Sequence, residues 1–331
     1  MSSNIKRYFL WPLLVAGALL AFTGYEFGAE ALILAAILSV LEVTLSFDNA
    51  VVNAKILKKM SPIWQKRFLT WGILLAVFGT RFLLPIVIVS IAVFASPLAI
   101  TLLALREPAE YSHLLESVHG SITAFGGTFL LMVALKYFFD QAKDIHWIHS
   151  IERHLVKIGK IEALEIVLTL IILLTLSFLS YGHELQILTS GVIGLILFIL
   201  MEGVAGTLSE EGPSKAAGGL SLFIYLNVLD SAFSLDGVVG AFALTTNLFI
   251  IMIGLGIGAY FVRSMTVYFV KENTLAELRY LEHGAHWAIL GLAVAMFVSL
   301  LYPVPEIVTG LIGLLFVGLS YVSSRREKLE K

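Results

Sequence analysis

The stretch Leu41–Val51 reads LEVTLSFDNAV and places two acids, Glu42 and Asp48, inside an otherwise apolar segment. A second stretch, Leu229–Val239, reads LDSAFSLDGVV and has acids at the corresponding positions. The two align without a gap at an offset of 188 residues, as Leu-[Glu/Asp]-x3-Ser-x-Asp-x-x-Val. The chain therefore contains an internal repeat whose shared feature is a pair of acids within apolar sequence.

The composition indicates the class of protein. Of the 331 residues, 58% are hydrophobic and 14% are charged, against about 25% charged in ordinary globular proteins. With a mean hydropathy of +0.91 and a net charge of −2, the chain is neither a soluble enzyme, nor a disordered chain, nor a basic nucleic-acid binder. The absence of cysteine excludes disulfides and thiolate metal sites, which leaves carboxylates and histidines as candidate ligands.

Ten apolar stretches approach the roughly 20 residues that a helix needs to cross a bilayer. They lie near residues 8–24, 30–54, 68–90, 120–140, 163–181, 187–206, 219–245, 248–270, 285–302 and 306–323. We predict an all-α polytopic membrane protein with about ten transmembrane helices and one membrane domain, 1–331. The run from Phe68 to Leu105 is too long for one straight span, and Pro85 and Pro97 predict a kink followed by an interfacial or re-entrant piece.

The distribution of lysine and arginine predicts the orientation, because cytoplasmic loops accumulate these residues. With the N-terminus inside, 19 of the 22 fall on the cytoplasmic side, Arg106 lies outside, and Arg81 and Arg263 lie within spans. The basic pair before Tyr8–Phe22 resembles the start of a signal peptide, but the pattern holds only if this first span is kept. We predict a multi-pass protein of the bacterial inner membrane with both termini cytoplasmic. Residues 140–162 are a cytoplasmic connecting segment, expected to contain an amphipathic surface helix.

The two acidic motifs are expected to cross the membrane in opposite directions, because an odd number of spans, five, separates them. We assign residues 8–181 to a first repeat with the motif 41–51, and residues 187–323 to a second repeat with the motif 229–239. Inverted-topology repeats with helices broken at the midplane are typical of secondary transporters.

The intramembrane carboxylates require neutralisation, because each costs roughly 2.5–3.5 kcal/mol near the bilayer centre. Protons, ion pairs or a bound cation can supply it, and only Arg81 and Arg263 are available within spans. These arginines either neutralise the acids when the site is empty or extend to an interface. Cations or protons must therefore neutralise the remaining acids.

Helix geometry limits how the acids converge, because residues i, i+4 and i+7 share one face. In the two motifs these positions are Glu42, Ser46 and Asn49, and Asp230, Ser234 and Gly237. Convergence of Asp48 and Asp236 with them requires both helices to unwind near the Ser-x-Asp, which would also free backbone carbonyls. Carboxylate, amide and carbonyl oxygens suit hard divalent cations such as Mg²⁺, Ca²⁺ and Mn²⁺.

We therefore predict one metal site, formed by both motifs. Its ligands are Glu42, Asp48, Asn49, Asp230 and Asp236, and its supporting residues or charge partners are Ser46, Ser234, Arg81, Arg263 and Glu202. The alternative is a proton-bridged cluster that holds two helices together, with the serines and Asn49 as interhelical hydrogen-bonding groups. Glu202 is either an inner-gate ligand or a helix-end carboxylate that faces water.

Several histidines near the ends of spans have two interpretations each. His146 and His149 have the i,i+3 spacing of a metal pair, but a solvated helix face is favoured. Two further groups either line the two mouths of a pathway or are ordinary loop residues: His113, Glu116 and His119 outside, and Glu282, His283 and His286 inside. The glycines Gly254, Gly256 and Gly258 follow no strand, so we interpret them as helix-packing positions and not as a dinucleotide motif.

The first motif resembles the Glu-x-x-Leu-Ser-x-Asp-Asn signature of the TerC family of bacterial integral membrane proteins, part of the LysE-like transporter group. The second, Asp230–Asp236, is similar to the family's Asp-x-x-Phe-[Ala/Ser]-x-Asp-Ser, although Gly237 replaces the usual serine and Val239 the usual proline. The likeness covers roughly 30–145 and 219–323, and the rest resembles a longer branch with an extra N-terminal helix. The resemblance implies Mn²⁺ efflux, metal homeostasis and a historical link to tellurium resistance.

The function we predict from these features is proton-coupled export of a divalent cation, with Mn²⁺ favoured by the resemblance. The alternatives are a Ca²⁺ or broad divalent cation/H⁺ exchanger, and a non-transporting membrane partner that delivers metal. An intramembrane aspartyl protease is disfavoured, because Phe47 and Leu235 precede the second acids and no Gly-x-Gly-Asp occurs. We expect no enzyme activity and no prosthetic group, and we expect the lipid bilayer, the metal ion and protons as partners. Nucleic acid is not expected, and the sequence identifies no protein partner.

Overall fold

The computed structural model of the chain describes the backbone of residues 2–207 and 215–330. Within these ranges every regular element is a helix, which confirms the all-α prediction. The first half contains α1 (Ser2–Phe27), α2 (Ala29–Leu45), α3 (Phe47–Lys58), α4 (Pro62–Leu74), η1 (Leu75–Leu83, a π-helix), α5 (Leu84–Ala92), α6 (Pro97–Arg106), α7 (Pro108–Ser117), α8 (His119–Phe139) and α9 (His149–Ile158). The second half contains α10 (Leu164–Leu179), α11 (Glu184–Thr207), α12 (Lys215–Leu244), α13 (Leu248–Lys271), α14 (Thr274–Glu277), α15 (Leu281–Ser299) and α16 (Glu306–Glu330).

Six of the described helices are long and apolar enough to cross a membrane alone, and two bent helix pairs raise the number to eight. The protein is therefore a multi-pass membrane protein. One of the ten predicted spans corresponds to a shorter apolar helix, α10. The 16 residues of α10 extend roughly 24 Å at 1.5 Å per residue, less than the ~30 Å of a hydrocarbon core.

One of the two bent pairs lies where the sequence predicts an interruption, and the other bends ahead of the predicted kink. Helices α2 and α3 meet at Ser46 with a bend of 52°. The segments Pro62–Gly72 and Leu75–Ile91 meet at 47°, where the π-helix η1 precedes α5 and its Pro85. Pro85 lies ten positions after Leu75, in the first turn of α5, and Pro97 begins the short apolar helix α6.

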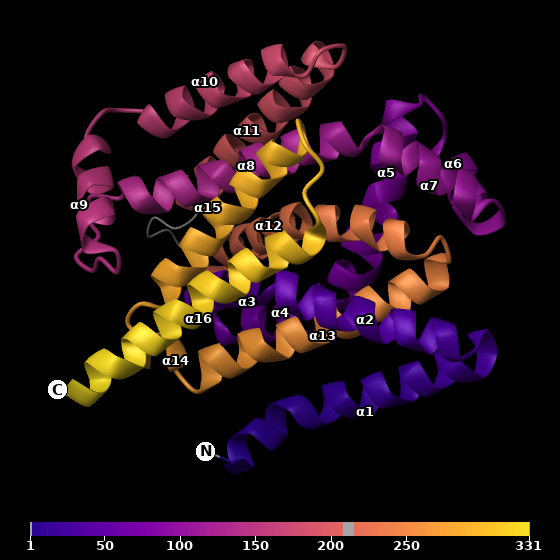
Figure 1. The fold of residues 1–331 in the computed structure, drawn as a ribbon. Coiled ribbons are helices and arrows are strands. Elements are labelled where there is room, and N and C mark those ends of the chain that lie inside the picture. Colours follow the sequence, from indigo (N-terminus) through magenta and orange to yellow (C-terminus); the bar gives the residue numbers. More distant parts are fainter. Residues whose placement is uncertain (1, 208–214, 331) are drawn as a thin grey trace.

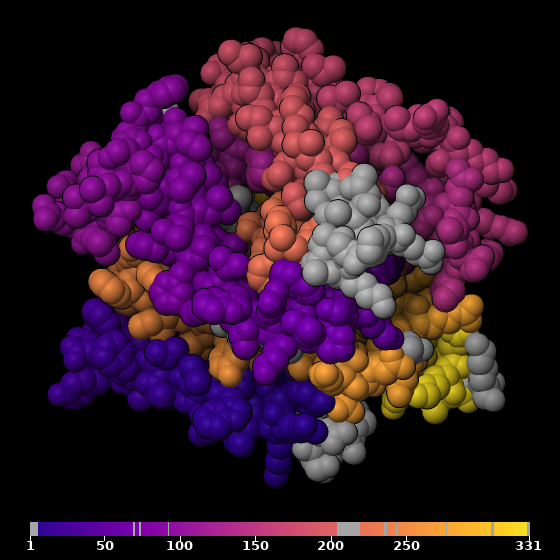
Figure 2. All heavy atoms as spheres, turned by 180° about the vertical axis from the view of Figure 1, so that it is seen from behind, coloured from indigo at the N-terminus to yellow at the C-terminus, as the bar shows by residue number. Residues whose placement is uncertain are grey.

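Helix α8 lies at the centre of the bundle and α1 at its periphery. Of the apolar window in α8, 78% is buried, against 17% in α1. The main apolar core joins residues of α8 and α15 with others from α3, α12 and α13. Helix α1 packs along α2 and α13, and the indigo band at the lower edge in Figure 2 shows it as an outer layer. Its exposed side chains, such as Trp11 and Leu13, are apolar, as expected for a surface that faces lipid.

Two glycines of α13 allow this helix to approach α2 closely. A Cβ at Gly254 would lie 2.6 Å from the Cβ of Leu38, and a Cβ at Gly258 would overlap the side chain of Glu42. Ser39 Oγ also donates a hydrogen bond to Gly254 O across this interface, at 3.0 Å. The predicted packing role of these glycines is thus confirmed, and the close contact fixes the part of α2 that carries Glu42.

Both chain termini lie at the same end of the bundle, together with α9 and α14, whereas α6 and α7 lie at the opposite end (Figure 1). The predicted surface helix of the connecting segment is present as α9. Its Glu152 is fully buried and binds α15, where His283 Nδ1 lies 2.7 Å and Trp287 Nε1 3.0 Å from the carboxylate. Lys143 Nζ lies 2.9 Å from the same carboxylate, so one acid holds the connecting segment against the bundle.

Candidate functional site

The first acid of the first motif forms a buried ion pair. Arg81, on η1, binds Glu42 Oε1, and 3% and 2% of the two side chains are exposed. Ser46 Oγ donates a second hydrogen bond to the same oxygen at 2.8 Å. Oε2 of Glu42 is directed toward α12, where a Cβ at Gly237 would lie 3.6 Å from it. This arginine therefore does not extend to an interface.

The bend at Ser46 gives Asp48 a favourable position for a negative charge. Because α3 begins at Phe47, Asp48 lies in the first turn of a helix, where backbone N–H groups and the helix dipole favour an anion. The carboxylate is 2% exposed, and its Oδ1 has no hydrogen-bond partner among the described residues. Within this part of the chain no basic side chain pairs with it.

The bend is not the unwound stretch that the sequence predicts. Ser46 N–H still donates to Glu42 O at 3.0 Å, and Ala50 N–H donates to Ser46 O at 3.2 Å. The carbonyls of Glu42 and Ser46 are therefore held by hydrogen bonds and are not free to act as ligands. The change of axis alone turns Asp48 relative to α2.

The first acid of the second motif connects the two motifs. Asn49 Nδ2, on α3, donates a hydrogen bond to Asp230 Oδ1, on α12, at 2.7 Å. Arg263, on α13, lies 3.6 Å from Asp230 Oδ2, donates to Gly72 O at 3.0 Å, and stacks 3.7 Å from the ring of Phe68. Arg263 is 3% exposed, so it also remains inside the protein.

The second motif is not interrupted. Helix α12 is continuous from Lys215 to Leu244, so the predicted break near Ser234-x-Asp236 is wrong. Ser234 is 3% exposed and its Oγ has no hydrogen-bond partner among the described residues, whereas the hydroxyl of Ser46 is held by Glu42. Asp230 is one methylene shorter than Glu42, and Asn49 and Arg263 hold its carboxylate instead.

The two motifs contact each other with their positions exchanged. Glu42 of the first motif lies beside Gly237 of the second, and Asp230 of the second binds Asn49 of the first. In the alignment at an offset of 188 residues, Glu42 corresponds to Asp230 and Asn49 to Gly237. The first acid of each motif therefore contacts the residue that lies seven positions after the first acid of the other motif. Each first acid also has its own arginine.

The predicted ligands are only partly assembled. In the described part of the chain, no group of three or more aspartate, glutamate or histidine residues is close enough to hold a metal ion. The side chain of Asp236 lies outside the described residues, so its distance from Asp48 is not defined. Glu202, on α11, does not join the buried acids. It pairs with Lys136 at 3.4 Å at the rim of a cavity.

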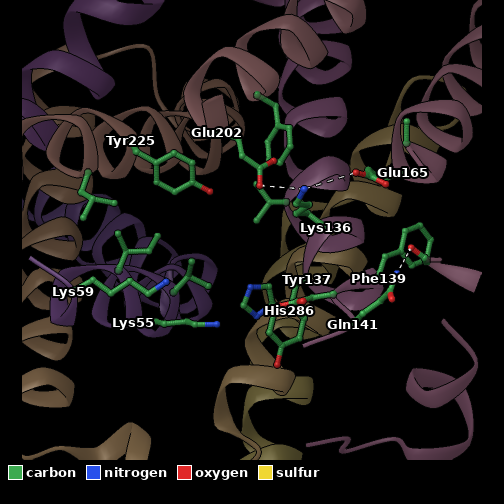
Figure 3. Close-up of a pocket in the computed structure, with 18 of the residues that line it drawn as sticks. Lys55, Lys59, Lys136, Tyr137, Phe139, Gln141, Glu165, Glu202, Tyr225 and His286 are labelled. Atoms are coloured by element: carbon green, nitrogen blue, oxygen red, sulfur yellow. Dashed lines mark hydrogen bonds and ion pairs between the residues drawn. The ribbon is translucent and has the colours of Figure 1, made fainter. Parts of the chain in front are cut away.

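A large cavity opens at the end of the bundle that carries the termini. It encloses about 1170 Å³ and is lined by α3, α8, α11 and α12 together with the connecting segment. Figure 3 shows Lys136 between Glu202 and Glu165, with Lys55 and Lys59 across the cavity. Of the three inner mouth candidates, only His286 lines this cavity, stacked on Tyr137 with ring centroids 3.6 Å apart.

The other two inner candidates have different partners. His283 binds Glu152, and Glu282 pairs with Lys55. His146 Nδ1 lies 3.9 Å from Glu152, and its ring centroid lies 5.9 Å from that of His149. The contacts of His283 and His146 with Glu152 attach the connecting segment, whereas the pair between Glu282 and Lys55 joins α15 to α3.

A smaller cavity of about 270 Å³ lies on the other side of the buried acids along α12. Its lining includes Val239, the last residue of the second motif, and Gly240, which follows it, together with Glu116 and His119, two of the outer mouth candidates. The large cavity is lined by Val52, which follows the first motif. Neither cavity is lined by Glu42, Asp48 or Asp230, so both end short of the buried acids.

The sequence interpretation missed two polar residues with enclosed amide oxygens, the buried Asn53 and the partly buried Asn227. Both lie at helical spacing from motif residues, because Asn53 follows Asn49 by four positions and Asn227 precedes Asp230 by three. That spacing on an apolar helix was the available signal. It also missed Glu152, since an acid in a polar loop segment carries no pattern that indicates burial.

The chain belongs to a family described as "Protein of unknown function (DUF475)", whose profile matches residues 47–330. The match includes Asp48, Asn49 and the whole second motif, and it begins after Glu42. Comparisons with curated proteins and with solved structures each found no match.

Proposed function

We propose that this protein is a secondary transporter that exports a divalent cation in exchange for protons. Among divalent cations, the resemblance of both motifs to the TerC family favours Mn²⁺. The cytoplasmic side is the end that carries both termini, as the distribution of basic residues predicts. The membrane is a bacterial inner membrane.

The observation that carries this proposal is the environment of Asp48. A carboxylate in the interior of an apolar bundle is costly unless something neutralises it. Asp48 is buried, one of its oxygens has no partner, and no arginine or lysine of the described residues pairs with it. A proton or a metal cation is the remaining means of neutralisation, and exchange between the two is the chemistry of a proton-coupled metal transporter.

The two arginines act as internal counter-ions in this mechanism. Arg81 pairs with Glu42, and Arg263 lies beside Asp230. Each acid and its arginine together therefore carry no net charge in the present arrangement. A divalent cation that arrives at Asp48 competes with the arginines for the neighbouring carboxylates. Loading of the cation then requires the ion pairs to open, and its release allows them to close again.

The exchange of contacts between the motifs supports an inverted repeat. Each first acid lies against the other motif, and each motif is followed by a cavity, the large one beyond Val52 and the small one beyond Gly240. Two related halves that run in opposite directions would place one cavity at each membrane surface. Alternate extension of these cavities to the acids gives alternating access.

Reconstitution into proteoliposomes tests the function directly. We expect the purified protein to move Mn²⁺. The flux should be faster when the proton gradient drives protons in the direction opposite to that of Mn²⁺, because the two are exchanged. Asp48→Asn, which keeps the size of the side chain, should reduce the flux by about tenfold or more. Asp144→Asn is the matched control, because Asp144 is an exposed acid of the connecting segment.

The same preparation separates the alternatives. Flux of Ca²⁺ in preference to Mn²⁺ indicates the broader exchanger. Tight stoichiometric Mn²⁺ binding without flux indicates a metal-delivery protein. A protein that neither binds nor moves a divalent cation at any gradient contradicts the proposal, and so does wild-type flux in Asp48→Asn.

A further inference from the structure

Two asparagines, the buried Asn53 and the partly buried Asn227, continue the polar seam that begins at the hydrogen bond between Asn49 and Asp230. Asn53 lies one turn beyond Asn49 on α3, and Asn227 lies one turn before Asp230 on α12. Residues three or four positions apart occupy one helix face. Since Asn49 and Asp230 face each other, Asn53 and Asn227 lie on the same facing surfaces.

These asparagines lie between the buried acids and the large cavity. The two helices run in opposite directions along the seam, because Leu57 of α3 packs in the same apolar cluster as Leu226 of α12. The cavity is lined by α3 from Val52 onward and by α12 up to Tyr225. A group that leaves Asp48 for the cavity along this seam therefore passes Asn53 and Asn227.

Each asparagine contributes an oxygen that has no hydrogen-bond partner in the part of the chain that the structure describes. Asn53 is 1% exposed, and its Oδ1 has no hydrogen-bond partner among the described residues. Asn227 Nδ2 donates to Phe223 O at 2.7 Å, which fixes its amide orientation and leaves its buried Oδ1 without a partner in the same part of the chain. Buried acceptors are rarely left unpaired, so two on one seam require an explanation.

We propose that the amide oxygens of Asn53 and Asn227 form a second, neutral site where a divalent cation pauses between the acidic pocket and the large cavity. This inference rests on the proposed transport function. It adds the path that the cation takes from the acidic pocket to the large cavity at the end of the bundle that carries the termini. Amide oxygens are ordinary ligands of hard divalent cations. Since the two side chains carry no charge, they hold the cation weakly, and weak binding at successive sites permits rapid passage.

The experiment removes these oxygens without changing the acidic pocket. Asn53→Leu and Asn227→Leu are measured in proteoliposomes for Mn²⁺ flux, and in detergent for Mn²⁺ affinity by calorimetry. We expect the flux to fall by about tenfold or more, as for the loss of a ligand, with the affinity within about twofold of wild type. Asn53→Asp keeps the shape of the side chain and adds a charge, so it should bind Mn²⁺ more tightly and release it more slowly.

Thr128→Val is the matched control. Thr128 is fully buried, and its Oγ1 also has no hydrogen-bond partner among the described residues. It faces α11 instead of the seam, since a Cβ at Gly191 would lie 3.0 Å from its Oγ1. Flux in this variant should equal that of wild type.

The outcomes distinguish this inference from the function on which it rests. Wild-type protein that moves no divalent cation overturns both. Wild-type flux in Asn53→Leu and Asn227→Leu, with transport intact in the parent, overturns the relay site alone. A fall in flux in Thr128→Val equal to that in the seam variants also overturns it, since any buried oxygen would then have the same effect. If the leucine variants do not fold, unchanged affinity and flux in Asn53→Asp overturn it.

Discussion

The ion pair between Glu42 and Arg81 is enclosed by protein on all sides, and its chemistry sets the consequence of removing one member. A buried charge that loses its partner costs about 3–5 kcal/mol, whereas replacement of both charges is often close to neutral. Arg81→Gln should therefore lower the thermal stability of the purified protein markedly. The double variant Glu42→Gln/Arg81→Gln should recover most of that loss.

The same pair of variants separates stability from transport. The double variant lacks a proposed ligand, so it should be stable and inactive in the Mn²⁺ flux assay. Thermal unfolding followed by tryptophan fluorescence in detergent measures the stability. Arg81→Gln with wild-type stability would show that Glu42 is protonated in the folded protein and has no need of the arginine.

Among single residues, Glu42, Asp48, Asn49 and Asp230 were all identifiable from sequence, because acids and amides in apolar helices are conspicuous. Which partner each one takes was not, since the arginines lie 39 and 33 positions away from their acids on other helices. The pairing depends on side-chain length and on the approach of the helices. Neither quantity is encoded in a local pattern.

At the level of elements, the contact between α13 and α2 determines where Glu42 lies. A Cβ at position 258 would overlap the Cβ and Cγ of Glu42 and lie 3.0 Å from Ser39 O. Gly258→Ala should therefore push α13 away from α2, at a cost of about 1–3 kcal/mol, and should reduce Mn²⁺ flux. Gly17→Ala in α1 is the control, because nothing lies within 4 Å of the added methyl group.

Stability and flux are measured as for the arginine variants. Gly17→Ala should leave both unchanged or raise stability slightly, since alanine favours a helix over glycine. An equal effect of the two substitutions would mean that helix propensity, and not the close contact, accounts for the result at Gly258.

The attachment of α9 is predicted to depend on pH. Burial by itself raises the pKa of Glu152, but hydrogen bonds from His283, Trp287 and Lys143 outweigh it and hold the pKa well below the usual 4.5. A carboxyl group with a lowered pKa in the folded state stabilises that state above its unfolded pKa. This stabilisation is lost as the pH falls below about 4.5 toward the folded value. Above that range it is fully present.

Protease sensitivity of the connecting segment measures this attachment. Cleavage of wild type should increase progressively as the pH falls from about 5 to 3. Glu152→Gln, which removes charge-assisted hydrogen bonds worth about 2 kcal/mol, should be cleaved readily at all pH values and show a much flatter profile. The difference between the two profiles isolates Glu152 from other acids. A wild-type profile that matches the variant would contradict the buried carboxylate contact.

The bend at Ser46 was predictable and the continuity of α12 was not. Both motifs carry Ser-x-Asp, so the pattern predicts the same break twice. Only the first has a glutamate long enough to accept a hydrogen bond from the serine four positions later. In the second, Asp230 is held by α3 and α13, and the helix remains continuous. The length of the acidic side chain and its tertiary contacts thus distinguish two motifs that share the same Ser-x-Asp pattern.

At the scale of the whole molecule, hydropathy identified every long apolar helix, but it overstated the span of α10, whose 16 residues form a short apolar helix. A window of hydropathy registers apolar residues that extend beyond a helix end, such as those around Ser180, where α10 stops. The mouth candidates from the sequence include three residues that line the cavities, His286 the large one and Glu116 and His119 the small one. The extent of each cavity has no local pattern, because the cavities form between helices distant in the chain.

The cavities make a prediction about access from the two membrane surfaces. The chain has no cysteine, so single cysteines can be labelled with a membrane-impermeant maleimide without background. Lys59→Cys reports on the large cavity and Glu116→Cys on the small one, since both residues are exposed. Lys328→Cys, in the last turn of α16, marks the side of the termini.

Because the two cavities lie on either side of the buried acids along the bundle, they should open to opposite surfaces. Lys59→Cys should label only in membranes oriented so that Lys328→Cys labels, and Glu116→Cys only in the opposite orientation. Val51→Cys, which is fully buried beside Asn49, should not label from either side. If Lys59→Cys and Glu116→Cys react from the same surface, the two motifs do not lead to opposite sides of the membrane, and alternating access around Asp48 is contradicted.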